Sequence, residues 1–255
     1  MLLRSMVRFF IKEEQKVNDE IVIRGPDVKH IGKVLRLSKG ETIEVFDGSG
    51  RQYVVRLERV GKEEVRGVIV KRCLASRDTF PQIIVGQGIP KGKKLDFVIQ
   101  KLTELGIHSF VPLLTERTIL RLDPLTQKAK LSRWQRIALE ASKQSRRFFP
   151  PHINDIMTLQ EFCASSQECD LKLLLWEEEG ERELKEALMS PLQRKRVAIL
   201  VGPEGGFSQE EVMIAQRYGF VPVSLGHSIL RTETAALAVV AIVQYELGGF
   251  SLKTH

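Results

Sequence analysis

The spacing of apolar residues divides the chain into a first part rich in short strands and a second part in which strands and helices alternate. In the first part, apolar positions predict strands over 7–11, 41–46, 51–60 and 65–72, and a one-sided helix over 26–37. The run Asp47-Gly48-Ser49-Gly50 between two of these strands has the chemistry of a hairpin turn. A unit of about 70 residues with this pattern predicts a small β-barrel.

From residue 82 onward, apolar strands alternate with helices. This alternation, sustained over about 175 residues, predicts a largely parallel, doubly wound sheet. We therefore expect an α/β protein with domains at 1–75 and 76–255. The predicted strands are 82–87, 109–113, 171–176, 197–201 and 221–225, and the predicted helices are 93–105, 124–142, 181–188 and 235–243.

Two of these strands run into glycine-containing loops, at Gly202–Phe207 and Gly226–Thr232. Open α/β sheets place ligands beyond the carboxyl ends of their strands. The glycines Gly202, Gly205 and Gly206 would let the backbone approach a ligand and adopt a positive φ. We predict one pocket built largely from backbone groups. The alternative is a plain strand-to-helix turn, for which Ser208 and Glu211 supply a capping box.

The second loop leads into a helix that is apolar all round and is therefore predicted to be buried, including its start. Thr232 is the predicted N-cap. Arg231 and Glu233 would then lie beside apolar structure, where a charge needs a partner. A structural Arg–Glu pair and a functional role are both consistent with this pattern.

Charge is distributed unevenly along the chain. The net charge of +7 is the sum of +5 over 1–75, +8 over 76–150 and −6 over 151–255. A basic front part indicates a polyanionic partner, although a solvated basic surface would have the same composition. Three lysines, Lys91, Lys93 and Lys94, occur at a strand-to-helix turn. The densest charge in the chain lies at and just beyond a helix end, at Arg133, Arg136, Lys143, Arg146 and Arg147.

Several classes of protein and site are disfavoured. No apolar run reaches the ~18 residues of a membrane span, and the N-terminus lacks the features of a signal peptide. Cys73, Cys163 and Cys169 are odd in number and poorly spaced for zinc, so we expect reduced thiols in the cytoplasm and no metal. No catalytic triad or carboxylate dyad is visible in the sequence.

The sequence GPEGG, followed by LGHSILRTETA, closely resembles the knotted SPOUT methyltransferases. Within them the chain resembles the RsmE family, which methylates N3 of a uridine in 16S ribosomal RNA. The segments MVRFF, HIGKVLRLSKGETIEVFDGSG, IPKGKKLDFVIQKLTELGI and RWQRIALEASKQSRR follow the family pattern in order. Arg146 is a departure, because the family usually has glycine there.

The resemblance implies a PUA-like RNA-binding barrel, a C-terminal domain with a deep trefoil knot, and a homodimer formed through the knot. It implies S-adenosyl-L-methionine as cofactor and the small ribosomal subunit as partner. Cofactor contacts are predicted at Leu175, Trp176, Val201, Gly202, Pro203, Glu204, Gly205, Gly206, Leu225, Gly226, Ile229, Leu230, Thr232 and Thr234. RNA contacts are predicted at Arg8, Arg36, Lys91, Lys94, Lys101, Arg133, Arg136 and Arg147.

Methylation at N3 requires in-line transfer from an activated sulfonium and loss of the N3 proton. Arg231 is the predicted cation beside the developing uridine anion, with Arg147 as an alternative. Glu204 is the predicted base, and proton loss to water is the alternative. Two other functions stay open: a SPOUT enzyme that methylates ribose 2′-O or guanine N1, and a ribosome-binding protein without catalysis.

Overall fold

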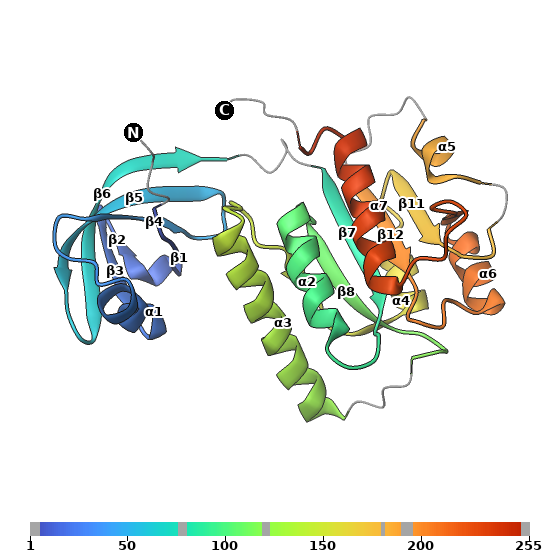
Figure 1. Ribbon diagram of the computed structural model, residues 1–255, viewed down its shortest axis with the longest axis horizontal. Coiled ribbons are helices and arrows are strands. Elements are labelled where there is room, and N and C mark those ends of the chain that lie inside the picture. Colours follow the sequence, from blue (N-terminus) through green and yellow to red (C-terminus); the bar gives the residue numbers. More distant parts are fainter. Residues whose placement is uncertain (1–5, 76–80, 119–122, 180–181, 190–195, 251–255) are drawn as a thin grey trace. The chain divides into compact units, whose positions relative to one another are not determined.

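A computed structural model describes residues 6–75, 81–118, 123–179, 182–189 and 196–250 of the 255-residue chain (Figure 1). These residues form two compact units. The first contains residues 6–75 together with Ser142–Phe149, and the second contains the other described residues. None of the described helices is both long and apolar enough to cross a membrane.

The first unit is a six-stranded sheet in the order β1-β4-β5-β6-β3-β2. Only β1 and β4 pair in parallel, and the other neighbours are antiparallel. Its apolar faces enclose one core that includes Phe9, Ile43 and Leu57. The predicted strands are confirmed. The elements are β1 (Arg8–Phe10), η1 (Glu13–Gln15), β2 (Lys16–Val17), β3 (Glu20–Arg24), α1 (Pro26–Lys29), η2 (His30–Val34), β4 (Thr42–Phe46), β5 (Arg51–Val60) and β6 (Glu64–Leu74).

The single helix predicted over 26–37 is wrong in its second half. After α1 the chain widens into a π-helical turn, η2, in which the Leu35 N–H donates to His30 O at 2.9 Å. Arg36 then adopts a φ of +53°, which ends the helical path. Of the predicted apolar face, Val28 and Ile31 lie in the core and Leu35 packs against it, whereas Val34 is 70% exposed, because the π-helical turn changes the direction of its side chain.

The second unit is a parallel sheet in the order β10-β8-β7-β12-β11-β13, with β9 also paired to β8. Apolar residues of α2 and α7 pack on one face, and those of α4 and α6 on the other, as a doubly wound sheet requires (Figure 1). The strands are β7 (Gln82–Gly88), β8 (Ser109–Leu114), β9 (His152–Ile153), β10 (Met157–Thr158), β11 (Leu171–Leu175), β12 (Arg196–Val201) and β13 (Val221–Val223). The helices are α2 (Lys94–Leu105), α3 (Pro124–Gln144), α4 (Leu159–Ser165), α5 (Leu184–Leu188), α6 (Gln209–Arg217) and α7 (Thr232–Glu246).

The helix ends test several local predictions. Gly106 ends α2 with a φ of +99°, and Ser208 with Glu211 forms the predicted capping box of α6. The prediction of Thr232 as N-cap of α7 is wrong. Arg231 occupies the N-cap position with extended backbone, because the Thr232 hydroxyl is bonded to Gly202 instead.

The predictions of burial along α7 and of the start of α5 also need correction. The described helical part of α5 begins at Leu184, not near residue 181. Arg231 is exposed at the start of α7, and Ile242 is 41% exposed and Tyr245 73% exposed farther along it. An apolar helix is therefore buried on only part of its circumference here.

Candidate functional site

A cavity of about 410 Å³ lies at the carboxyl ends of β11, β12 and β13. Its volume is typical of small-molecule sites, which measure about 300–1,000 Å³. Three loops and the start of α7 form its wall. The lining residues are Lys94, Leu175, Trp176, Glu177, Val201, Gly202, Pro203, Glu204, Gly206, Phe207, Val223, Ser224, Leu225, Gly226, His227, Ser228, Ile229, Leu230, Arg231, Thr232, Glu233 and Ala235.

Most of the predicted cofactor residues line this one cavity, and Gly205 and Thr234 do not. Gly206 has the positive φ, +68°, that the loop requires, whereas Gly205 does not. A Cβ added at Gly205 would lie 3.2 Å from the Arg117 side chain. Arg117 also donates to the Gly205 carbonyl. The absence of a side chain at Gly205 therefore makes room for Arg117, not for a ligand.

Three acidic side chains line the cavity, and two of them, Glu177 and Glu233, were not predicted as cofactor contacts. Glu233 Oε2 is buried and has no hydrogen-bond partner among the described residues. A buried carboxylate oxygen without a donor is costly. Glu177 was detectable in principle, because it follows a predicted strand at the ligand-binding edge of the sheet.

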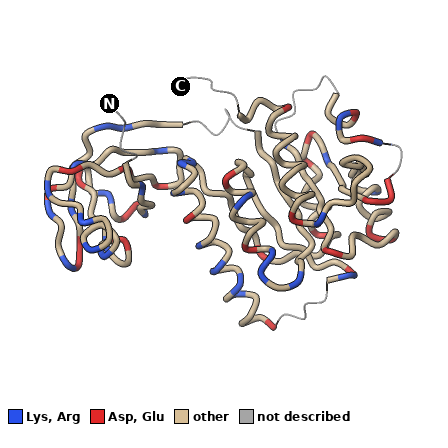
Figure 2. Tube along the Cα trace, viewed as in Figure 1, with Lys and Arg blue, Asp and Glu red and all other residues tan. Residues whose placement is uncertain are grey.

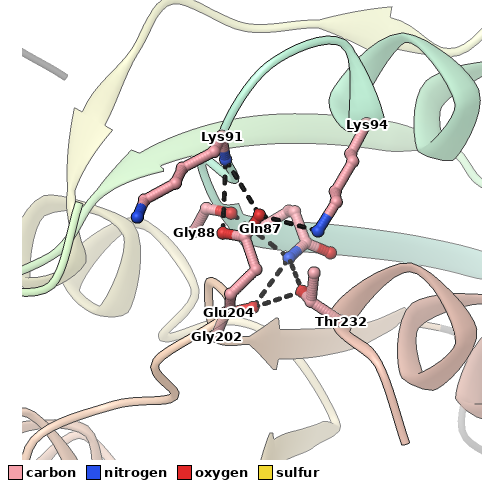
Figure 3. A network of polar contacts seen from close by, with 7 residues as sticks. All are labelled: Gln87, Gly88, Lys91, Lys94, Gly202, Glu204 and Thr232. Atoms are coloured by element: carbon pink, nitrogen blue, oxygen red, sulfur yellow. Dashed lines mark hydrogen bonds and ion pairs between the residues drawn. The ribbon is translucent and has the colours of Figure 1, made fainter. Parts of the chain in front are cut away.

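The Glu204 carboxylate joins the loop after β12 to the loop after β7 (Figure 3). Its two oxygens accept the Lys91 backbone N–H at 3.1 and 3.2 Å, and Oε1 accepts Lys94 Nζ at 2.9 Å. Burial alone would raise the pKa of Glu204, but the hydrogen bonds from Lys94 and from backbone N–H groups outweigh it and lower the pKa. We refer to these contacts as the Glu204 clamp.

Behind the cavity wall lies a second polar network, around the fully buried Gln87 at the end of β7 (Figure 3). Gln87 Nε2 donates to Thr232 Oγ1 at 2.8 Å and to Gly202 O at 2.9 Å. Thr232 Oγ1 donates to the same Gly202 carbonyl at 2.5 Å. Three segments that are far apart in sequence thus meet at one triangle of hydrogen bonds. No local sequence pattern indicated it.

Arg231 lies at the cavity with its side chain exposed, so the prediction that it is buried is wrong. The described residues contain no Arg231–Glu233 ion pair, which removes the structural pair as an explanation of these two charges. Arg231 is an N-cap residue and its backbone C=O accepts the Ala235 N–H at 2.8 Å. Because its side chain is exposed at the cavity and not paired with Glu233, its guanidinium is available to a ligand or substrate.

The predicted RNA contacts of the second unit lie on α2, on α3 and in the loop before α2 (Figure 2). Lys91, Lys94 and Arg136 are exposed. Arg133 is also exposed and is paired with Asp96, which ties α3 to α2. The remaining member, Lys101, is half-buried and paired with Glu104 at 2.9 Å.

Among the predicted RNA contacts of the first unit, Arg36 is exposed and Arg8 is not. Arg8 is buried, with its guanidinium 4.0 Å from the centre of the Phe46 ring and bonded to Gln52 Oε1 at 3.1 Å. Its pKa falls to about 10 because burial outweighs the effect of Glu44. Arg147 is half-buried, and burial lowers its pKa to about 10. Neither side chain is placed as a free surface cation.

Both parts of the chain match families of known protein domains. Residues 78–244 match the RNA methyltransferase domain family, and residues 23–70 match the RNA methyltransferase PUA domain family. The first match covers well over half of the chain.

Relatives and solved structures agree with these matches over nearly the whole length. Ribosomal RNA small subunit methyltransferase E of Bacillus subtilis is 33% identical, over 94% of this chain and 97% of the relative. The Aquifex aeolicus protein of the same name is 32% identical, over 92% and 97%. The crystal structure of the Neisseria gonorrhoeae protein of that name, bound to S-adenosyl methionine, is 31% identical with a TM-score of 0.83 and covers 94% of this chain and 97% of that one. The chain therefore belongs to the ribosomal RNA small subunit methyltransferase E family.

Proposed function

We propose that the protein is an S-adenosyl-L-methionine-dependent methyltransferase that acts on N3 of a uridine in the 16S RNA of the small ribosomal subunit. The observation that carries this proposal is the cavity at the carboxyl ends of β11, β12 and β13. Its glycine-containing loops lie in the segment that matches the methyltransferase family, whose solved member holds S-adenosyl methionine. The uridine specificity rests on the RsmE resemblance.

The residues present at the cavity fit this cofactor. Gly202 and Gly206 line the cavity with backbone alone, and Gly202 needs to be glycine because a Cβ there would lie 3.0 Å from the Gly206 backbone. Glu233 Oε2 is a buried acceptor with no donor in the described part of the chain, and Glu177 adds a second carboxylate. A sulfonium or an ammonium group would compensate these negative charges. When bound, S-adenosylmethionine supplies a methyl group that is already activated for displacement.

The chain's own part in catalysis is orientation and charge stabilisation. Arg231 is exposed at the cavity rim, and a guanidinium there would stabilise the anion that develops on the uracil ring. Glu204 is a weaker candidate for base than its place in the loop indicated. Its carboxylate already accepts from Lys94 and Lys91, and its pKa is lowered. We infer that water takes the N3 proton and that Glu204 holds the two loops together.

We further propose that the second unit is a SPOUT domain with a C-terminal trefoil knot. After β13 at the sheet edge, the chain returns over the sheet so that α7 packs on α2 and contacts β12. A homodimer through this region is supported by Ile229, Ile242 and Tyr245, which are large apolar side chains exposed on the loop and on α7. We also propose that residues 1–75 form a PUA-like RNA-binding barrel and that residues 76–255 form the methyltransferase domain, with Ser142–Phe149 packed into the first compact unit.

The exposed cations Lys91, Arg133 and Arg136 are the proposed phosphate contacts of the second unit, with Arg36 on the barrel. Lys94 and Lys101 are secondary candidates, because each already pairs with a carboxylate. Arg8 and Arg147 have a structural role in this proposal, since Arg8 is buried against Phe46 and Gln52 and Arg147 is half-buried. A small-subunit RNA substrate implies that the enzyme works in the cytoplasm.

Nucleoside analysis of 16S RNA from cells that lack the protein tests the proposal directly. We expect loss of 3-methyluridine, restored by the wild-type gene and not by an Arg231→Ala variant. Loss of a ribose 2′-O-methyl or an N1-methylguanosine signal would instead identify another SPOUT specificity. The purified protein could also fail to transfer a tritiated methyl group to small-subunit RNA, with an unchanged nucleoside profile in the cells. This result would favour a ribosome-binding protein without catalysis.

A further inference from the structure

Gln87 does not line the cavity, yet its side chain is bonded to two of the segments that form the cavity wall. Its amide nitrogen has four acceptors close by: Gly88 O at 3.3 Å, Val201 O at 3.4 Å, Gly202 O at 2.9 Å and Thr232 Oγ1 at 2.8 Å. Carbonyl oxygens cannot donate, so this environment determines which way the amide points. The other end of the amide, Oε1, is buried and has no partner among the described residues.

The backbone around Gln87 is shaped for close approach. A Cβ added to the next residue, Gly88, would lie 2.5 Å from Pro203 Cδ and 2.7 Å from Pro203 N. Real side chains do not occupy such positions, so only glycine lets the end of β7 lie against the loop after β12. The loop is therefore held from two sides, by packing at Gly88 and by the amide of Gln87 (Figure 3).

We propose that Gln87 is a positioning residue of the cofactor site, which sets the separation of the loop after β12 from the start of α7. It would act through Gly202 and Thr232 and touch neither cofactor nor RNA. Both wall segments bond to the same amide nitrogen, so a shift of either segment would strain the hydrogen bond to the other. This proposal rests on the proposed function, because it takes S-adenosylmethionine as the ligand of the cavity.

The main test is Gln87→Leu, which keeps the approximate volume and removes both donors. Gly202 O then keeps only the Thr232 hydroxyl, and Thr232 Oγ1 loses its donor. Leaving buried acceptors without donors is expected to weaken S-adenosylmethionine binding by about tenfold or more, measured by calorimetry on the full-length protein. The matched control is Thr103→Val, which removes a buried hydroxyl bonded to Ile99 O at 2.7 Å within α2, outside the cavity lining.

A double-mutant cycle with Thr232→Val tests whether Gln87 holds the two wall segments jointly or makes two independent contacts. If Gln87 acts through Gly202 and Thr232, the loss of affinity in the double variant should be smaller than the sum of the two single losses, although Thr232→Val also removes the hydroxyl's own bond to Gly202 O. Losses that add would overturn the proposal. So would binding by folded Gln87→Leu within twofold of wild type, or an equal loss in Thr103→Val.

Gln87→Glu supplies a readout that a general loss of stability would not produce. The protonated carboxyl can still donate one hydrogen bond, whereas the carboxylate repels the Gly202 carbonyl. The cofactor affinity of Gln87→Glu, divided by that of wild type or of Gln87→Leu at the same pH, should therefore be higher at pH 5.5 than at pH 8. A flat ratio would count against the donor role.

Hydrogen exchange without cofactor separates this proposal from the proposed function. Gln87→Leu should speed exchange in both 202–207 and 226–232, and Thr103→Val in neither. If wild-type protein fails to bind S-adenosylmethionine, the proposed function fails, while the exchange pattern still tests whether Gln87 positions the two loops. Unchanged exchange in either loop of Gln87→Leu would overturn the positioning role even if the wild type binds the cofactor.

Discussion

The tight contact between Gly88 and Pro203 makes Gly88→Ala a sharp perturbation of the cofactor loop. Moving Pro203 from 2.5 Å to an ordinary contact of 3.4 Å requires a displacement of about 0.9 Å. The neighbour is backbone and a proline ring, so no flexible side chain can give way. Overpacking of this kind typically costs about 1–3 kcal/mol, of which lower unfolded-chain entropy offsets about 0.4–1 kcal/mol.

The functional effect should exceed the stability effect. A misplacement of about 1 Å in a catalytic site can lower the rate about 10²-fold. We expect Gly88→Ala to lose cofactor affinity and turnover while its melting temperature falls by only about 2–4 °C per kcal/mol. Calorimetry with S-adenosylmethionine, methyl transfer to small-subunit RNA and thermal unfolding, all on the same preparation, measure the three quantities.

Gly86→Ala, two residues earlier on β7, is the matched control. Its Cβ would lie 2.8 Å from the Phe162 ring and 3.0 Å from Leu113 Cδ1, two core residues that do not line the cavity. The two variants should therefore lose comparable stability, and only Gly88→Ala should lose cofactor affinity. Equal losses of affinity in both, or wild-type affinity in Gly88→Ala, would refute this reasoning.

Four further predictions concern single side chains. Arg231→Ala should lower turnover by about 10²–10³ with near-normal cofactor affinity, and full turnover by the folded variant would remove Arg231 from the mechanism. Because the pKa of Glu204 is lower folded than unfolded, the Glu204 clamp should persist above about pH 4.3 and be lost as pH falls through the lowered pKa. Hydrogen exchange of the loop after β12 measures this, and release near neutral pH would contradict it. If water is the base, turnover by Glu204→Gln should keep a constant ratio to wild-type turnover as pH rises, and a ratio that recovers at alkaline pH would identify Glu204 as the base. Arg136→Glu removes an exposed cation that has no ion pair within the described residues, so RNA affinity should fall and its salt slope flatten by more than one ion, with unchanged cofactor affinity. Arg146 has a φ of +57°, and its guanidinium pairs with the buried Glu44 at 3.8 Å. Both Arg146→Gly and Arg146→Val lose this pair, but only valine is strained at a positive φ, so Arg146→Gly should melt at the higher temperature. Equal melting of the two would show that the conformation carries no strain.

The positive φ of Arg146 also gives a physical reason for the family's glycine at that position. The resemblance identified the departure, and the backbone conformation explains why glycine suits it. The same holds for Gly206, whose left-handed φ was expected from the run of glycines, although the sequence could not distinguish it from Gly205. The folded backbone distinguishes them, because only Gly206 has the positive φ and only Gly205 lies in tight contact with Arg117.

Sequence alone was sufficient for the order and type of most elements. Periodicity and glycine position depend on each segment's own residues, and β5 matches its predicted range residue for residue. The cavity was also predictable, because strand ends in parallel sheets meet at one edge and both glycine loops follow such strands. The family motifs then identified the cofactor that such a cavity holds.

The tertiary structure decided which polar groups serve the site. Arg231 was expected to be buried because its helix is apolar, but exposure depends on which face other segments cover. Arg8 was predicted to contact RNA, but its guanidinium is buried against Phe46. Gln87 and Glu204 each bond to groups more than 100 residues away, and no local pattern encodes such a partner. Hydrogen bonds and burial depend on distances between segments, and these distances exist only once the chain has folded.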